Sequence, residues 1–211
     1  MKIGLFGGSF NPPHIGHTLI AKDFYYASNV DLLIIMPAYI SPFKGKTDVG
    51  AETRLEMAKL AFLPLGEEGI CYKVSDYEIS KGDVSYTVDT VEHLLREYNV
   101  EKIHLCVGSD MLFSIENWKN AKTLMEKCVI YSKERKDGEY ESMCAHAERL
   151  REKYGAQVII MHKKPYEASS TEARTDINSL ENTVSGKVRE YIKEKRLFEY
   201  SENGGEGKQD D

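Results

Sequence analysis

The stretch of the sequence with the clearest chemical potential is GGSFNPPHIGH, which begins at residue 7. It follows the short apolar run Ile3 to Phe6 and combines a turn at Gly7 and Gly8 with two imidazoles, His14 and His17. Glycine lets a backbone come close to a phosphate, and histidines three positions apart lie on one face of a helix. A neutral imidazole donates a hydrogen bond to a phosphoryl oxygen, and a protonated one adds a positive charge. We therefore expect this stretch to bind a polyphosphate.

A helix must hold the two imidazoles in place. After Pro12 and Pro13, which cannot continue a helix, the apolar spacing from Ile15 to Ala27 predicts a helix that begins near His14. The unpaired N–H groups of its first turn would attract the same anion as the rings. A histidine pair at this spacing is also half of a metal site, but no third histidine, cysteine or carboxylate stands at a recognisable spacing. The pattern therefore favours an anion site.

A second candidate anion site is the segment SSTEAR, which begins at residue 169. Ser170 and Thr171 are typical of a helix start, and Arg174 follows Thr171 by three positions, on the same predicted helix face. A hydroxyl, free backbone amides and a planar guanidinium together suit the β and γ phosphates of a nucleotide. The plain alternative is an ordinary capped helix with a solvated arginine.

Gly108 and Asp110 follow the apolar run Ile103 to Val107, at the expected carboxyl end of a strand. Open α/β sheets bind their ligands at this edge. Glycine would let a flat base or a ribose approach the backbone, and Asp110 could accept from a ribose hydroxyl or an adenine amine. The plain alternative is that Asp110 is the N-cap of a helix that begins at Met111, and the two roles are compatible.

The elements that must position these residues alternate along the chain. Strand-sized apolar runs of the kind buried on both faces of a sheet occur at Ile3 to Phe6, Leu32 to Met36, Ile70 to Val74, Ile103 to Val107, Cys128 to Tyr131 and Val158 to Met161. Helical spacing separates them, most clearly over Val88 to Tyr98 and over Tyr140 to Tyr154, where Gly155 predicts the end. The predicted fold class is therefore α/β, a Rossmann-like, doubly wound, mostly parallel sheet with helices on both faces.

One domain is expected over residues 1 to 200, because a single domain typically holds about 100 to 200 residues. Residues 37 to 50 lack a periodic pattern and are expected to form a loop. A last helix is expected after the candidate cap Thr183. The polar, glycine-rich segment 201 to 211 is predicted to be a disordered tail.

Composition narrows the classes of function. A formal net charge of −6 provides no broad cationic field, so we expect no polymeric nucleic acid as a partner. No apolar run approaches the ~20 residues of a membrane span, and the apolar stretch after Lys2 is too short for a signal peptide. The widely spaced cysteines are expected to be reduced core thiols; they are Cys71, Cys106, Cys128 and Cys144. A cytoplasmic protein without a membrane partner is predicted.

The opening stretch resembles the His-x-Gly-His signature of the nucleotidyltransferase superfamily. Four later segments extend the likeness: SPFKGKTDVGAETRLEMAKLA, SYTVDTVEHL, VGSDMLFSIENWKN and SSTEAR, which begin at residues 41, 85, 107 and 169. Together, over residues 1 to 198, they resemble the bacterial nicotinate-mononucleotide adenylyltransferases, and SYTVDT and the stretch from Gly108 to Trp118 are the most specific parts. The resemblance implies a Rossmann-like enzyme that joins a mononucleotide to ATP.

The resemblance also implies roles for particular residues. The catalytic residues would be His14, His17, Lys44 and Arg174. The ATP-binding residues would be Gly7, Gly8, Ser9, Phe10, His17, Gly108, Asp110, Ser170, Thr171 and Arg174. The acceptor-binding residues would be Asn11, Lys44, Thr87 and Trp118, with the Trp118 indole stacked on the pyridine ring.

Two of these positions leave an alternative open. Lys44 lies in the aperiodic loop, where a solvated lysine is the plain interpretation, and Lys46 competes with it for the substrate phosphate. Trp118 is the only tryptophan, and a lone tryptophan is more often a packing residue than a platform for a ligand. Lys119 follows it, where the family often has an aromatic residue.

The predicted reaction is attack of the phosphate of nicotinate mononucleotide on the α-phosphorus of ATP, which gives deamido-NAD and pyrophosphate. Mg²⁺ is the expected cofactor, carried by ATP and water rather than by protein ligands. The alternatives are the same transfer to nicotinamide mononucleotide, phosphopantetheine or a phosphorylated alcohol, and a protein that binds nucleotide without turnover. The presence of His14, His17, Thr171 and Arg174 argues against the protein without turnover.

Overall fold

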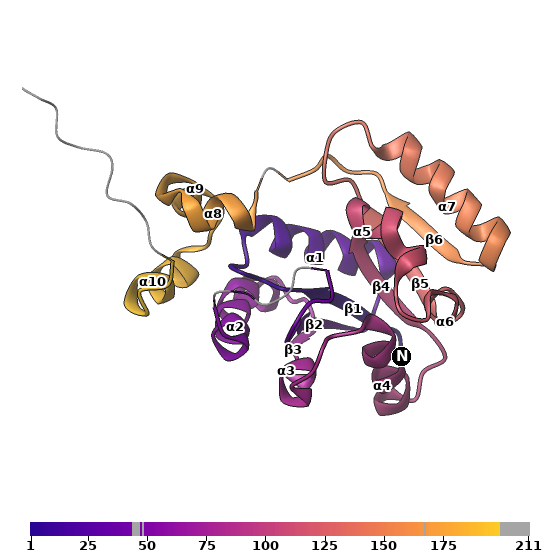
Figure 1. Ribbon diagram of the computed structural model, residues 1–211, viewed down its shortest axis with the longest axis horizontal. Coiled ribbons are helices and arrows are strands. Elements are labelled where there is room, and N and C mark those ends of the chain that lie inside the picture. The colour runs from indigo at the N-terminus through magenta and orange to yellow at the C-terminus, as the bar shows by residue number, and fades with distance from the viewer. Residues whose placement is uncertain (44–46, 48, 167, 199–211) are drawn as a thin grey trace, which may run out of the picture.

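The computed structural model describes residues 1–198, except 44–46, 48 and 167 (Figure 1). Its strands are β1 (Ile3–Gly8), β2 (Leu32–Pro37), β3 (Tyr72–Val74), β4 (Ile103–Gly108), β5 (Cys128–Lys133) and β6 (Gln157–Met161). Its helices are α1 (Ile15–Ser28), α2 (Ala51–Glu67), α3 (Tyr77–Lys81), α4 (Thr87–Tyr98), α5 (Ser109–Ser114), the 3₁₀ helix η1 (Ile115–Asn117), α6 (Ala121–Lys127), α7 (Tyr140–Tyr154), α8 (Ser170–Thr175), α9 (Ile177–Thr183) and α10 (Gly186–Glu194).

The strands form one parallel sheet in the order β3-β2-β1-β4-β5-β6. β1 pairs with β2 on one side and with β4 on the other. The strands after β1 are therefore added on one side of it up to β3 and on its other side from β4 onward, so the strand order reverses between β1 and β4. Ligands of open α/β sheets bind at such a switch point, outside the carboxyl ends of the strands. The predicted doubly wound sheet is confirmed, with β3 beginning at Tyr72 rather than at Ile70.

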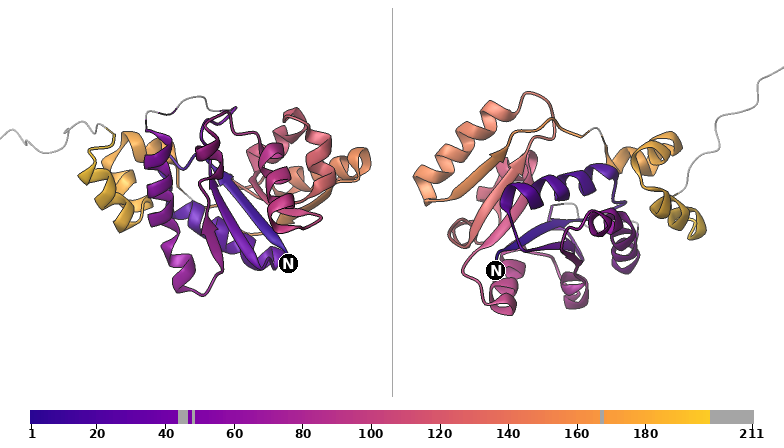
Figure 2. Two further views of the ribbon diagram at one scale, coloured as in Figure 1. Left: turned by 90° about the horizontal axis from the view of Figure 1, so that it is seen from below. Right: turned by 180° about the vertical axis from the view of Figure 1, so that it is seen from behind.

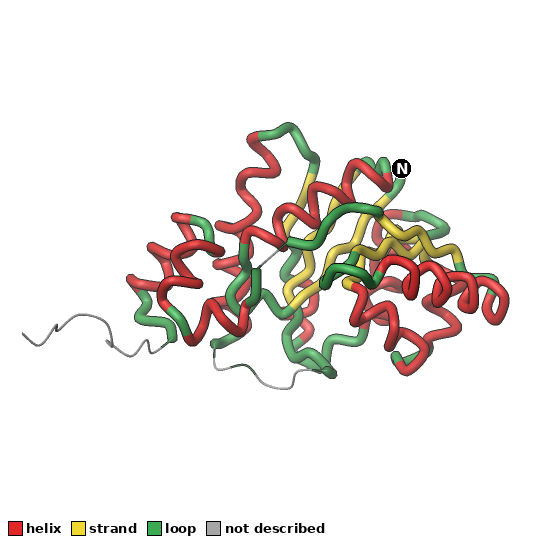
Figure 3. Tube along the Cα trace, turned by 90° about the horizontal axis from the view of Figure 1, so that it is seen from above, coloured by secondary structure: helices red, strands yellow, loops and turns green. Residues whose placement is uncertain are grey.

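Helices cover both faces of this sheet, because successive side chains of a strand point to opposite sides. Ile3 and Leu5 belong to the core that α4, α5, α6 and α7 complete. Phe6 and Leu33 belong to the core on the other face, with α1, α2 and the group α8–α10. Figure 2 shows α1 and α2 next to that group, and Figure 3 shows the strands running between the surrounding helices. Burial on both faces accounts for the continuous apolar runs of the sequence.

The ends of the helices follow local backbone chemistry. Gly155 ends α7 in the left-handed region at φ 65°, as predicted. The prediction for Thr183 was wrong: it is the last residue of α9, its hydroxyl donates to the Ser179 carbonyl (2.6 Å), and α10 takes Ser185 as its N-cap. The extended backbone at Val184 separates the two helices and moves the start of α10.

The cysteines are all free, but they are not all core residues. Cys106 and Cys128 are buried, and burial raises the pKa of the Cys128 thiol to about 12. Cys71 is exposed, because it precedes the short edge strand β3 instead of lying within it, so the prediction of a core thiol was wrong there. Within the part of the chain that the structure describes, no helix is long and apolar enough to cross a membrane.

Candidate active site

His14 and His17 lie together at the start of α1, as predicted. His14 is the N-cap, with an extended backbone, and its N–H donates to Nδ1 of His17 (3.1 Å). The His17 N–H donates in return to the His14 carbonyl (2.9 Å), and the two ring centroids are 3.7 Å apart. Because Nδ1 of His17 accepts this bond, the neutral ring carries its hydrogen on Nε2, as a donor to an anion requires.

Gly16 makes room for the His14 ring. A Cβ at residue 16 would lie 3.0 Å from His14 Nδ1 and 3.1 Å from its Cε1, closer than side chains normally pack. The glycine inside the His-x-Gly-His motif is therefore a steric requirement of the histidine pair. Sequence reasoning did not single out Gly16, because the requirement appears only once the ring is placed.

Phe10 supports His17 from the core. Its side chain is 2% exposed, and its ring meets the His17 ring edge to face at 5.2 Å between centroids. A Cβ at Gly8 would lie 3.0 Å from the Phe10 ring, so that glycine is fixed by packing, whereas at Gly7 a Cβ would meet only the Met36 carbonyl at 3.8 Å. The burial of the Phe10 ring leaves only its backbone for the predicted contact with ATP.

The segment SSTEAR docks against the opening loop. Ser169 is the N-cap of α8, and Ser170 Oγ donates to the Pro12 carbonyl (2.9 Å). Arg174 Nη1 donates to the Asn11 carbonyl (2.6 Å), and Nη2 donates to Thr171 Oγ1 (3.3 Å). The two predicted anion sites are therefore neighbours, and Thr171 and Arg174 share one face of α8, as expected.

A cluster around the buried carboxylate of Asp23, which we call the Asp23 cluster, joins α1 to β5 and to the segment before α8. Asp23 of α1 accepts from Lys133 at the end of β5 (2.9 Å), from Tyr166 (2.8 Å) and from Lys163. The Lys133 ammonium lies 3.5 Å from the centroid of the Tyr166 ring. Burial raises the pKa of Asp23, but the hydrogen bonds from Lys163, Lys133 and Tyr166 outweigh it, so that the pKa lies below its usual range. The cluster fixes the segment that leads into α8.

Asp110 lies at the carboxyl end of β4, as predicted, but it is not an N-cap. The helix α5 begins at Ser109 with Gly108 as its N-cap, so the prediction of a helix from Met111 was wrong by two residues. Asp110 instead accepts from Arg135 Nη1 (2.7 Å). A Cβ at Gly108 would lie 2.7 Å from Asp110 Oδ1 and 3.0 Å from Arg135 Cδ, so this ion pair requires the glycine. Arg135 was not predicted.

Glu139 fixes the loop that carries Arg135. Its carboxylate accepts from the buried Ser109 hydroxyl (2.6 Å) and from the backbone N–H groups of Arg135 and Lys136 (both 3.2 Å). The hydrogen bond from Ser109 is the main reason that the pKa of Glu139 lies below its usual range. An arginine is thereby held beside the predicted adenosine contact.

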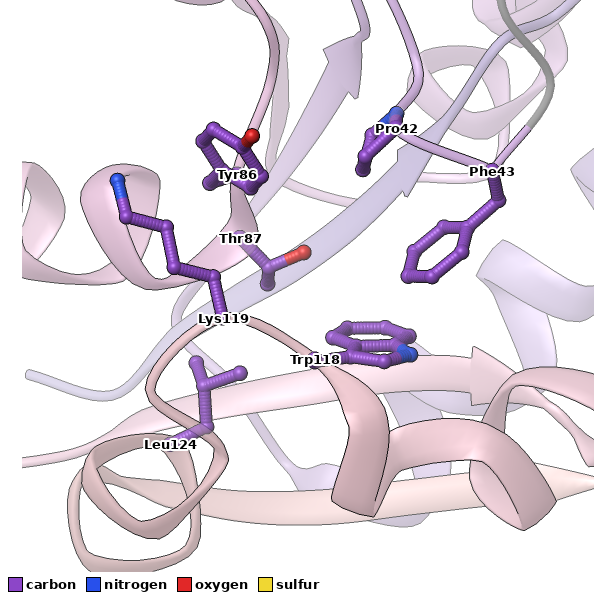
Figure 4. Close-up of a pocket in the computed structure, with 7 residues that line it drawn as sticks. All are labelled: Pro42, Phe43, Tyr86, Thr87, Trp118, Lys119 and Leu124. Carbon is purple, nitrogen blue, oxygen red and sulfur yellow. The ribbon is translucent and has the colours of Figure 1, made fainter.

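A small pocket of about 10 Å³, which we call the ring pocket because the Phe43 and Trp118 rings line it, lies beside the start of α4 (Figure 4). It is lined by Pro42, Phe43, Tyr86, Thr87, Trp118, Lys119 and Leu124. The Phe43 and Trp118 rings face each other with centroids 5.5 Å apart, and Figure 4 shows Thr87 between Lys119 and Phe43. The structure thus brings together two predicted acceptor residues, Thr87 and Trp118.

Lys119 forms part of the rim of this pocket. Its ammonium lies 4.3 Å from the centroid of the Tyr86 ring and 3.3 Å from Asp89 Oδ1. Lys81 also binds Asp89 (2.9 Å), and the hydrogen bond from Lys81, followed by that from Lys119, keeps the pKa of Asp89 below its usual range. Lys119 and Lys81 therefore share the Asp89 carboxylate, and Asp83 and Glu78 add negative charge close to Lys81.

Some predictions fall on parts of the chain that the structure does not describe. Lys44 and its competitor Lys46 lie outside the described residues, and so does the tail from 201 to 211. The roles given to the described site residues stay predictions, because their positions alone do not test them.

Comparison with known proteins shows the family to which the chain belongs. Residues 5–176 match the model of the cytidylyltransferase-like family, so the chain belongs to that family. Its sequence is also 34% identical to the "probable nicotinate-nucleotide adenylyltransferase" of Caldicellulosiruptor bescii, over 94% of this chain and 99% of that protein. The likewise named protein of Carboxydothermus hydrogenoformans is 30% identical, over 93% and 98%. Within the larger class, the chain is a member of the nicotinate-nucleotide adenylyltransferases.

Solved structures support the fold. A nicotinic acid mononucleotide adenylyltransferase of Plasmodium falciparum, complexed with NaAD, superposes with a TM-score of 0.71 at 19% identity, over 93% of this chain and 96% of the other. A "putative nicotinate-nucleotide adenylyltransferase" from Vibrio parahaemolyticus gives a TM-score of 0.56 at 20% identity. At these identities the likeness shows the shared architecture.

Proposed function

We propose that this protein transfers the adenylyl group of ATP to nicotinate mononucleotide, a step of NAD biosynthesis. A phosphate oxygen of the mononucleotide attacks the α-phosphorus of ATP in line. The bond from the α-phosphorus to the oxygen that bridges to the β-phosphorus breaks, and pyrophosphate leaves with that electron pair. The products are deamido-NAD and pyrophosphate. No nucleophilic side chain is needed, so positioning and charge neutralisation supply the catalysis.

The histidine pair acts on the polyphosphate. With its Nδ1 occupied by the His14 N–H, His17 directs Nε2 as a donor toward the phosphoryl oxygens, where negative charge builds up in the transition state. His14 lies against it and contributes a second imidazole at the same helix end. The amino end of α1 adds its partial positive charge.

The start of α8 holds the leaving group. Arg174, Thr171 and Ser170 are gathered beside the opening loop, where they would bind the β and γ phosphates and then pyrophosphate. Gly7, Gly8 and Ser9 would meet ATP through the backbone. Asp110 and Gly108 would bind the adenosine part, close to Arg135.

The ring pocket takes the acceptor. The nicotinate ring would stack on Trp118, with Thr87 beside it and the Lys119 ammonium near its carboxylate. Asn11 and Lys44 would bind the phosphate of the mononucleotide, with Lys46 as the alternative to Lys44. A carboxylate substituent suits this pocket better than a carboxamide, because the Lys119 side chain that lines it can pair with a negative charge.

Mg²⁺ would accompany ATP. Among the described residues no group of three or more histidine, cysteine or acidic side chains is placed to hold a metal ion, so the proposal assigns the ion to phosphate oxygens and water. When bound, it neutralises charge on the phosphates. The side chains described above bind and orient the two nucleotides around it.

We also propose that residues 1–200 act as one catalytic domain in the cytoplasm on small nucleotides, without a membrane or polymeric nucleic acid as a partner. The net charge of −6 and the free cysteines support this.

The observation that carries the proposal is the contact between the two anion sites, in which Arg174 binds the Asn11 carbonyl beside the His14–His17 pair. Pyrophosphate release should be measured with ATP and each of four acceptors: nicotinate mononucleotide, nicotinamide mononucleotide, phosphopantetheine and a phosphorylated alcohol. Release with nicotinate mononucleotide at the highest kcat/KM is expected. Preference for another acceptor would reassign the substrate, and no release with any of them would favour a nucleotide-binding protein without turnover.

A further inference from the structure

Glu78, in α3, is a buried carboxyl group that the proposed mechanism does not use. The residue is only 8% exposed. Its Oε1 accepts a hydrogen bond from the hydroxyl of Thr90 in α4 (2.5 Å), and the hydroxyl of Ser85 donates to the same carboxyl group. The positive charge of Lys81 acts on Glu78, but the Lys81 ammonium is hydrogen-bonded to Asp89 (2.9 Å). The hydrogen bonds to Glu78 therefore come from two hydroxyl groups rather than from a cation.

The two hydroxyl groups lie on either side of the start of α4. Ser85 comes two residues before Thr87, the first residue of the helix, and Thr90 lies three residues after it. The Thr90 N–H also donates to the Tyr86 carbonyl (3.4 Å). Tyr86 and Thr87, which stand between the two hydroxyl groups along the chain, line the ring pocket (Figure 4). One carboxyl group thus binds both flanks of a segment that contributes two residues to the pocket.

Glu78 also sets the direction of the Ser85 hydroxyl. A hydroxyl group has one hydrogen to donate and lone pairs with which to accept. Because the hydrogen is directed to Glu78, the oxygen accepts from the N–H of Tyr39 (2.9 Å). The Ser85 N–H donates in turn to the Ile40 carbonyl (2.9 Å). The residue before Tyr86 is thereby joined to the residues that follow β2.

Burial makes the loss of either hydroxyl group costly. Burial raises the pKa of Glu78, more than the hydrogen bonds from Thr90 and Ser85 and the charge of Lys81 lower it. A polar group withdrawn from water costs free energy unless its hydrogen bonds are made, so a buried network is sensitive to the loss of any member. A displacement of Ser85 or Thr90 would leave the carboxyl group short of a donor. The network therefore favours a single position for the start of α4.

We propose that Glu78 is a positioning residue for the ring pocket, which holds Tyr86 and Thr87 where they meet the acceptor mononucleotide. Glu78 is not among the described residues that line the pocket, so it acts through the start of α4. The inference rests on the proposed function, because that function assigns the pyridine ring to this pocket. ATP is assigned to the opening loop, α1, α5 and α8, which do not contain Glu78, Ser85 or Thr90. The effect of Glu78 should therefore be confined to the acceptor.

The variant Glu78→Ala tests this, because it removes the carboxyl group that Ser85 and Thr90 share. Steady-state kinetics should show a KM for nicotinate mononucleotide that is raised about tenfold or more, and a KM for ATP within about twofold of that of the natural protein. Glu78→Gln should bring the KM for the mononucleotide back to within about threefold, because its carboxamide accepts from Thr90 and donates to Ser85. An unchanged KM for the mononucleotide in folded Glu78→Ala, equal rises in both KM values, or no rescue by Glu78→Gln would overturn the proposal.

The matched control is Leu94→Ala, which removes a buried side chain about one turn beyond Thr90 in the same helix. It should lower the melting temperature, because a buried apolar side chain is lost, but leave both KM values within about twofold. This separates positioning of the pocket from a general loss of stability. A KM for the mononucleotide that rises as much in Leu94→Ala as in Glu78→Ala would also overturn the proposal.

Thr90→Val provides the test in case Glu78→Ala does not fold, because valine keeps the branched shape and removes only the hydroxyl group. The KM for the mononucleotide should rise about threefold or more, and the KM for ATP should stay within about twofold. An unchanged KM for the mononucleotide in this variant would overturn the proposal. The proposed function fails separately, if the natural protein forms no deamido-NAD.

Discussion

At the scale of single residues, the His-x-Gly-His motif works as a packing unit as well as a chemical one. His14 caps α1 while its backbone fixes the tautomer of His17, and Gly16 leaves room for the His14 ring. The spacing of the two histidines in the sequence predicts that they lie together on one face at the start of a helix. It does not predict the need for Gly16, because that need depends on where the His14 ring comes to lie.

Replacing His17 by alanine should lower kcat severely without unfolding the protein, because its ring lies at the ligand-facing start of α1. Loss of one preorganised donor costs about 3 kcal/mol, or roughly a hundredfold in rate. Steady-state kinetics of the purified variant, with circular dichroism to establish that it is folded, checks this. A folded variant with near-normal kcat would rule out the catalytic role.

Replacing Arg174 by alanine should weaken ATP and pyrophosphate. A charged hydrogen bond is worth about 1.5 to 3 kcal/mol, or roughly a ten- to hundredfold change in Kd. AMP and nicotinate mononucleotide should hardly change, because they lack the β and γ phosphates. Calorimetric titration of all four ligands measures the difference.

The matched control for that experiment is Arg189→Ala. Arg189 donates to the Glu181 carbonyl (2.9 Å) within the α9–α10 region and should leave every Kd unchanged. Equal losses for ATP and AMP in Arg174→Ala would mean that Arg174, through its bond to the Asn11 carbonyl, supports the opening loop rather than the leaving group.

Trp118 is the only tryptophan, so its fluorescence reports on the ring pocket alone. Stacking of the nicotinate ring should change the emission with a saturating dependence on nicotinate mononucleotide. Stacking contributes about 0.5 to 1.5 kcal/mol, so Trp118→Ala should raise the KM for the mononucleotide up to about tenfold and leave the KM for ATP unchanged. Unaltered emission from an active enzyme at saturating mononucleotide would contradict the placement.

At the scale of elements, periodicity and apolar runs predict the strands and helices, but not all of their ends. β3 and α10 each begin two residues later than expected, and α5 begins two residues earlier. The residue at an N-cap also depends on the side chains that surround it: at Gly108, before α5, Asp110 and Arg135 fill the space where a side chain would be. Such competition is invisible in a single stretch of sequence.

The pKa of Asp23 determines how one part of the free energy of unfolding depends on pH. The folded-state pKa of Asp23 is lowered, so its ionised form contributes stability above the unfolded pKa of about 3.9, and that contribution is lost as the pH falls through the folded value. Asp23→Asn should therefore lower the free energy of unfolding at pH 7 by about 3 to 5 kcal/mol, because Lys133 is left buried without its anion. Urea unfolding from pH 7 to pH 3 measures both effects.

The control for this pH dependence is Asp137→Asn, which changes an exposed aspartate. The free energy of unfolding of Asp137→Asn should fall with decreasing pH as steeply as that of the natural protein, whereas that of Asp23→Asn should fall less steeply. An Asp23→Asn variant whose free energy of unfolding falls with pH as steeply as that of the natural protein would show that other carboxylates dominate.

At the scale of the whole molecule, the strand order places residues from both ends of the chain at one switch point. Ser170 and Arg174 reach the opening loop, and Lys133 reaches Asp23, only because β1, β4 and β5 are neighbours. The sequence predicts the doubly wound class and the residues at the carboxyl ends of strands. It does not predict Arg135, because its partner Asp110 lies far away along the chain.

The central claim is that the intact phosphate of nicotinate mononucleotide attacks the α-phosphorus of ATP. The direct test uses nicotinate mononucleotide labelled with ¹⁸O at its free phosphate oxygens, unlabelled ATP and mass spectrometry of both products. All of the label should appear in deamido-NAD, and pyrophosphate should carry none. Label in pyrophosphate, or the absence of any labelled dinucleotide from the folded protein, would contradict the claim.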